Sequence, residues 1–168
     1  ELGIGQDRAR TVGERIVEVA SIVLRRYRSG NRQPSYRNVR FENASRLSRC
    51  QQVVRELVEA TMYGREETWS EASCCARSTQ IRLHWASEQG RYIEAKDIHD
   101  VQPGDIVYIG GGSVTCSDCG RSCGHVMVYV GDDDDGEMMM WQNTSYERKA
   151  LCSIPIREEQ SERFLAAY

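Results

Sequence analysis

The chain contains 168 residues with 22 basic and 25 acidic side chains, which give a net charge of −3 at neutral pH. That length predicts one domain over residues 1–168 with a buried hydrophobic core, preceded by a loose tail over residues 1–7. The acidic balance argues against a nucleic-acid partner, because such proteins concentrate positive charge. No apolar run in the sequence reaches the length of a membrane span.

The first third of the sequence predicts two helices separated by an irregular segment. Apolar residues recur at helical spacing over residues 8–28, and Gly30 follows the expected end of that helix. Residues 35–45 show no regular period and are predicted to be irregular. A second helix then extends to about Tyr63, with Gly64 as its C-terminal cap.

The start of the second helix carries a cysteine. Ser48 is a suitable N-cap, and Gln51 three residues later completes a capping box. Cys50 would then lie in the first turn, where backbone amides and the positive end of the helix dipole favour a thiolate. A cysteine in this position is predicted to act as a nucleophile.

Beyond the second helix the pattern changes from helical to extended. A third helix is predicted to begin at Ser78 or Thr79 and to end near Gly90. Short apolar runs bounded by turn residues follow it. They predict strands over residues 92–93, 106–109, 125–130, 137–142 and 151–156, with a short helix at the C-terminus. Helices first and strands afterwards predict an α+β fold, an antiparallel sheet with helices packed on one side.

Two further motifs accompany Cys50. A Pro-Gly-Asp turn at residues 103–105 precedes the strand over residues 106–109, and Gly124-His125 opens the next strand. These features together resemble the NlpC-type cell-wall peptidases, a papain-like superfamily that also includes the CHAP amidases. The resemblance covers roughly residues 8–155. It implies a papain-like NlpC-type fold in which Cys50 is the nucleophile and His125 is the base.

The resemblance also implies a third polar residue, which would orient the imidazole from the following strand. Gln142 is the preferred candidate, and Asn143 is the alternative that the CHAP pattern favours. Adjacent strand residues point to opposite faces, so at most one of the two can reach His125. Tyr36 lies where the family keeps a tyrosine near its active site, which implies a substrate-binding role.

The function implied by the resemblance is hydrolysis of amide or peptide bonds, most directly those of peptidoglycan, by an endopeptidase or amidase that requires no catalytic cofactor. An autolysin, a phage lysin or a tail-associated peptidase would fit, so we expect a secreted, cell-wall or virion location with virion or assembly partners. Arg49 and Gln51 depart from the acid and small residue that usually flank the nucleophile. Two alternatives therefore stay open: a non-catalytic structural or binding domain with the same fold, and a transglutaminase-like or acyltransferase-like enzyme.

The chain has seven cysteines, an odd number that leaves at least one thiol outside any set of disulfides. Cys116, Cys119 and Cys123 form a C-x2-C-x3-C cluster just before His125. Thiolates at this spacing can share a tetrahedral zinc ion, with a fourth ligand from Cys74, Cys75 or an acid. Disulfides between this loop and the Cys74-Cys75 pair are the competing prediction.

Overall fold

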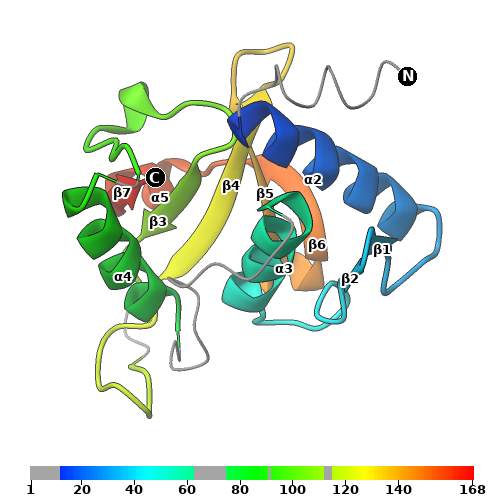
Figure 1. The fold of residues 1–168 in the computed structure, drawn as a ribbon, viewed down its shortest axis with the longest axis horizontal. Coiled ribbons are helices and arrows are strands. Elements are labelled where there is room, and N and C mark those ends of the chain that lie inside the picture. The colour runs from blue at the N-terminus through cyan, green and yellow to red at the C-terminus, as the bar shows by residue number, and fades with distance from the viewer. Residues whose placement is uncertain (1–11, 63–74, 91, 112–114) are drawn as a thin grey trace.

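The fold is built on a five-stranded antiparallel sheet with the strand order β6-β5-β4-β3-β7 (Figure 1). A computed structural model describes residues 12–62, 75–90, 92–111 and 115–168. The strands of this sheet are β3 (Ile106–Ile109), β4 (His125–Asp132), β5 (Met138–Thr144), β6 (Ala150–Pro155) and β7 (Phe164–Ala167). Every neighbouring pair is antiparallel, as the sequence predicts.

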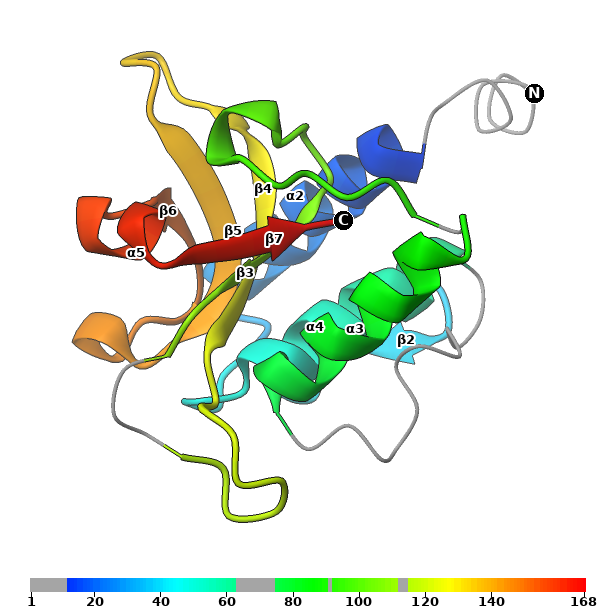
Figure 2. The same ribbon diagram turned by 90° about the vertical axis from the view of Figure 1, so that its left-hand side faces the viewer.

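Three helices cover one face of this sheet (Figure 2). They are α2 (Val12–Arg28), α3 (Cys50–Met62) and α4 (Ala76–Glu88). In α2 the buried residues Ile16, Val19, Ala20, Val23, Leu24 and Tyr27 recur at helical spacing and form one apolar stripe. The predicted α+β class is therefore confirmed, with an antiparallel sheet that contacts the helices.

Alternate residues of the central strands divide the interior into two cores. Val126 and Val128 of β4 pack with the helices, whereas Met127 and Tyr129 pack on the opposite face. Residues 95–101 and the C-terminal strand contribute to this second core, and α5 (Glu158–Glu162) lies on the same side. Packing on both faces therefore fixes β3 and β4, the strands on either side of the loop that precedes His125.

Several boundaries differ from the sequence predictions. The third helix begins at Ala76, ahead of Ser78 and Thr79, because Cys75 occupies its N-cap position. Residues 35–45 contain a small hairpin of β1 (Ser35–Tyr36) and β2 (Val39–Arg40). The predicted strand at residues 92–93 is wrong, and Ala95 instead forms an isolated bridge.

The largest omission is β7. The sequence predicts a C-terminal helix, and α5 is that helix, but residues 164–167 continue as an edge strand against β3. The loose tail over residues 1–7 and the cap at Gly64 lie outside the described residues. Within the described part of the chain, no helix is both long and apolar enough to cross a bilayer.

Candidate active site

Cys50 is the first residue of α3, and its thiol hydrogen bonds to His125 at the start of β4. The backbone amides of Gln51 and Val126 also donate to this sulfur. The predicted cap at Ser48 is wrong, because Ser48 has a left-handed backbone with φ of 60° and the helix begins one residue later than that cap requires. The cysteine nevertheless lies in the first turn, as predicted.

The buried side-chain amide of Asn143 binds the loop that precedes Cys50. The Asn143 side chain is fully buried, and its Oδ1 accepts a hydrogen bond from the Arg49 backbone at 2.9 Å. Its Nδ2 donates to the carbonyls of Asn43 at 3.1 Å, Ala44 at 3.3 Å and Arg46. Asn143 therefore fixes residues 43–49 immediately before the cysteine, and its amide does not contact His125.

Gln142 is the residue that contacts the imidazole. Its Oε1 lies 2.7 Å from His125 Nε2. The register of β4 and β5 explains this contact, because Met127 lies opposite Gln142 and His125 is two residues earlier on the same face. Since Gln142 Nε2 donates to the Met140 carbonyl at 3.4 Å, Oε1 is free to accept the imidazole N–H. The proton on Nε2 leaves Nδ1 for the thiol of Cys50.

The contact between Cys50 and His125 changes the pKa of both groups. Burial would raise the pKa of the Cys50 thiol, but the hydrogen bond and charge of His125 outweigh it and lower that pKa below 9.0. Burial would likewise lower the pKa of His125, but the hydrogen bond and charge of Cys50, with the Gln142 contact, raise it above 6.5. Both directions favour a thiolate–imidazolium pair.

A cleft of about 420 Å³ opens onto this pair. It is lined by residues 48–52 at the start of α3, residues 75–76 at the start of α4, and residues 123–125 and 143–145. The Cys50 side chain is only partly buried, so a ligand in the cleft can reach it. Tyr36 is not among the lining residues, because it lies in β1 and packs against the helix-side core.

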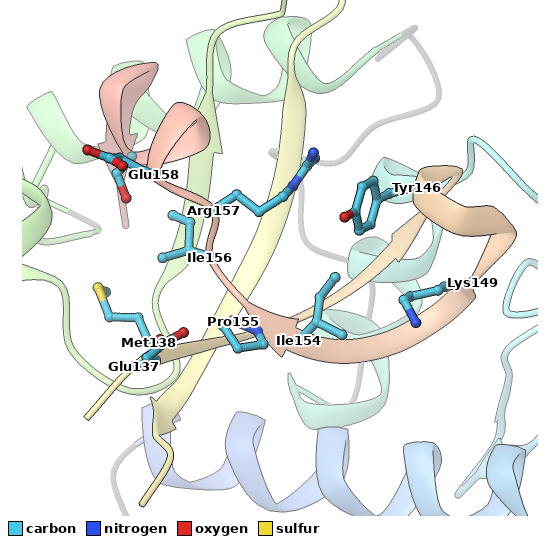
Figure 3. A pocket seen from close by; sticks show the side chains of 10 residues that line it. Glu137, Met138, Tyr146, Lys149, Ile154, Pro155, Ile156, Arg157 and Glu158 are labelled. Carbon is cyan, nitrogen blue, oxygen red and sulfur yellow. The ribbon is translucent and has the colours of Figure 1, made fainter. Parts of the chain in front are cut away.

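A second cavity of about 730 Å³ is lined by Tyr146 and by residues of β5, β6 and α5 (Figure 3). Residues 144–145 line the cleft, and the next residue, Tyr146, lines the second cavity. The Arg157 guanidinium lies 4.1 Å from the centre of the Tyr146 ring, and the two side chains point toward each other in Figure 3. Arg157 is near enough to His125 for its charge to oppose protonation of the imidazole. Sequence analysis missed both residues, because neither belongs to a motif.

The cysteine cluster differs from the predicted set. The sulfurs of Cys75, Cys116 and Cys119 all lie within 4.8 Å of one another and could hold a metal ion such as zinc. Cys75 replaces Cys123 in this group, because the start of α4 packs beside the cysteine loop. Cys123 instead lines the cleft, with its thiol hydrogen bonded to that of Cys116. Cys74 lies outside the described residues.

No protein-family model matches the chain, and no curated protein sequence matches it.

Proposed function

We propose that this protein is a cysteine hydrolase that cleaves amide bonds. The observation that carries the proposal is the hydrogen-bonded series Cys50, His125 and Gln142, which opens onto a cleft. A nucleophile, a base within hydrogen-bond reach and a group that orients the base are the parts that acyl transfer requires. The opposite pKa shifts of the thiol and the imidazole support the same assignment.

In the proposed reaction the Cys50 thiolate attacks the substrate carbonyl carbon. The backbone amide of Cys50, in the first helical turn, donates to the developing oxyanion. The C–N bond then breaks, and the His125 imidazolium gives its proton to the leaving amine. Water attacks the resulting thioester while His125 accepts the water proton, which releases a carboxylic acid and restores the thiolate–imidazolium pair. Gln142 keeps the ring in the correct orientation and tautomer throughout.

The substrate we propose is a peptide of peptidoglycan. The order of a helix-start cysteine, a strand-start histidine and a polar residue on the next strand is similar to the NlpC-type peptidases of the papain-like superfamily. An autolysin, phage lysin or tail-associated peptidase would place the enzyme outside the cytoplasm, at the wall or on a virion.

Digestion of purified peptidoglycan by the wild-type protein and by Cys50→Ala tests this proposal. Wild type should release soluble fragments with new amino and carboxyl termini, read by mass spectrometry, and Cys50→Ala should release none. Cys152→Ala is the control for loss of a buried thiol: Cys152 lies opposite Gln142 in the β5–β6 register but does not line the cleft, so this variant should still release fragments. Equal release by wild type and Cys50→Ala would overturn the proposal.

The hydrolase assignment and the peptidoglycan substrate are separate parts of the proposal, and experiments can reject one without the other. If peptidoglycan is untouched but a peptide thioester or activated ester is hydrolysed only when Cys50 is present, the hydrolase assignment holds and the wall substrate is wrong. If neither substrate reacts and Cys50 shows ordinary thiol reactivity, the protein is a binding domain that retains the arrangement without its activity.

A further inference from the structure

We propose that Cys75, Cys116, Cys119 and Cys123 bind one structural zinc ion, which joins the start of α4 to the loop before His125. The inference does not depend on the proposed hydrolase activity. It rests on the sulfur positions, on the backbone that presents them, and on the two elements that they connect. Figure 2 shows the loop over residues 115–124 at the end of the sheet where β4 begins, near the start of α4.

The sulfur spacing matches a shared metal ion better than a disulfide. Cys75 Sγ and Cys119 Sγ lie 3.7 Å apart, and Cys116 Sγ is within 4.8 Å of both. Two thiolates bound to a tetrahedral zinc at about 2.3 Å are about 3.8 Å from each other. Bonded sulfurs of a disulfide are only about 2.05 Å apart. The Cys75–Cys119 pair therefore has the separation of neighbouring ligands in a tetrahedral thiolate site, and Cys116 is near enough to be the third ligand.

The loop backbone presents Cys116 and Cys119 on a tight turn. Cys116 N donates to the Arg121 carbonyl at 2.7 Å, and Gly120 N donates to the Cys116 carbonyl at 2.9 Å. Gly120 has a φ of 70°, which glycine adopts without the strain that a side chain would add. A β-bridge between residues 115 and 122 closes the base of this turn. The turn holds two sulfurs close together before any metal binds.

Cys75 supplies a ligand from a second element. It occupies the N-cap position of α4, and its side chain makes no capping hydrogen bond to the helix. The positive end of the helix dipole favours the thiolate form that binds metal. One backbone bond already links the two elements, since Arg77 N donates to the Cys123 carbonyl at 3.1 Å. Zinc would add a second, stronger link at the same place.

Cys123 completes the set of four thiolates. Its sulfur is outside the group of three that lie within 4.8 Å of one another, but its thiol contacts that of Cys116, which makes it the candidate for the fourth ligand. Four sulfur ligands favour zinc over calcium or magnesium, which prefer oxygen. Cys75 and Cys123 both line the Cys50 cleft, and His125 follows Cys123 by two residues. The metal would therefore fix one wall of the cleft and the start of the histidine strand.

Metal content and thiol content of the purified full chain test the proposal together. We expect about one zinc per chain by elemental analysis, and seven free thiols after unfolding in a metal chelator. Cobalt substituted for zinc should give the absorption of a tetrahedral thiolate complex. A metal-free protein with disulfides among Cys75, Cys116, Cys119 and Cys123, or with all thiols free and no cobalt binding, would overturn it.

A variant pair localises the ion. Cys119→Ser removes one ligand from an exposed position, so it should lose little packing and should bind zinc much more weakly than wild type. Cys152→Ser removes a cysteine from β6 and should keep full zinc content. Zinc retained equally by both variants would contradict the assignment, whether or not either variant has hydrolase activity.

Discussion

Replacing Gln142 by alanine tests how the histidine is controlled. The substitution removes the acceptor 2.7 Å from His125 Nε2 and leaves the thiol contact in place. A hydrogen bond to a charged group contributes about 1.5–3 kcal/mol, which corresponds to a loss of roughly 10- to 150-fold in kcat/KM. Because that bond raises the pKa of His125 and stabilises its charge, the pKa of Cys50 should also move back toward 9.0 in the variant.

The assay is kcat/KM for peptide release, measured together with the pH dependence of Cys50 alkylation by iodoacetamide. Gln142→Glu is the matched variant, since it retains an acceptor at the same reach and should keep more activity than Gln142→Ala. A folded Gln142→Ala protein with wild-type kcat/KM and an unchanged alkylation profile would refute the orienting role. Activity lost with the alkylation profile unchanged would place Gln142 against the substrate instead.

Three further predictions concern the frame around the site. Asn143→Ala should lower the free energy of unfolding by at least about 2 kcal/mol in urea, since four backbone groups of residues 43–49 each lose one hydrogen bond; unchanged stability with activity abolished would instead make Asn143 catalytic. Burial raises the pKa of Glu56 from 4.5 to about 7. Between pH 4.5 and about 7 the folded state therefore holds more protons than the unfolded state, so the free energy of unfolding should fall as pH rises, by up to about 3 kcal/mol. Glu56→Gln should reduce this pH dependence, and the same dependence in the variant and wild type would contradict the assignment. Gly124→Ala should destabilise more than Gly136→Ala: both have positive φ, but only the first places its Cβ against a backbone atom, 2.8 Å from the Ile109 carbonyl oxygen. Equal losses of stability in thermal unfolding would count against that contact.

Local pattern was sufficient to predict the main elements. The period of apolar residues located α2 and α3, and the turn residues before residue 106 located β3. The contact between Cys50 and His125 could not come from pattern alone, because it joins elements 75 residues apart in the sequence (125 − 50). It was predicted only through the resemblance to a family that keeps these two residues in this order.

Long-range contacts explain the details that were wrong or left open. The Ser48 cap failed because Asn143, far along the chain, holds the loop before Cys50 in another conformation. The choice between Gln142 and Asn143 depended on the register of β4 and β5, which short-range spacing does not fix. The strand β7 was missed because its sequence ends in two alanines, which give little strand signal.

Sequence spacing was also insufficient to predict which cysteines lie together, because one of them comes from a distant element. Spacing alone selected Cys116, Cys119 and Cys123, since they are neighbours in sequence. Cys75 was predicted only as one of three possible fourth ligands, and it lies in the cluster because α4 begins earlier than its apolar residues indicate and its N-cap meets the loop. The sequence signal that could have located Cys75 is its position just before the first residue of α4.

The pH dependence of Cys50 alkylation, in wild type and in His125→Ala, tests most directly whether these two residues form an activated pair. Mass spectrometry of the labelled protein can follow each cysteine separately, with Cys152 as the internal reference because burial raises its pKa. We predict that wild-type Cys50 reacts before Cys152, with an inflection below 9.0, and that His125→Ala moves this inflection upward. Identical profiles in the two proteins, or slower labelling of Cys50 than of Cys152, would contradict the assignment of Cys50 as an activated nucleophile.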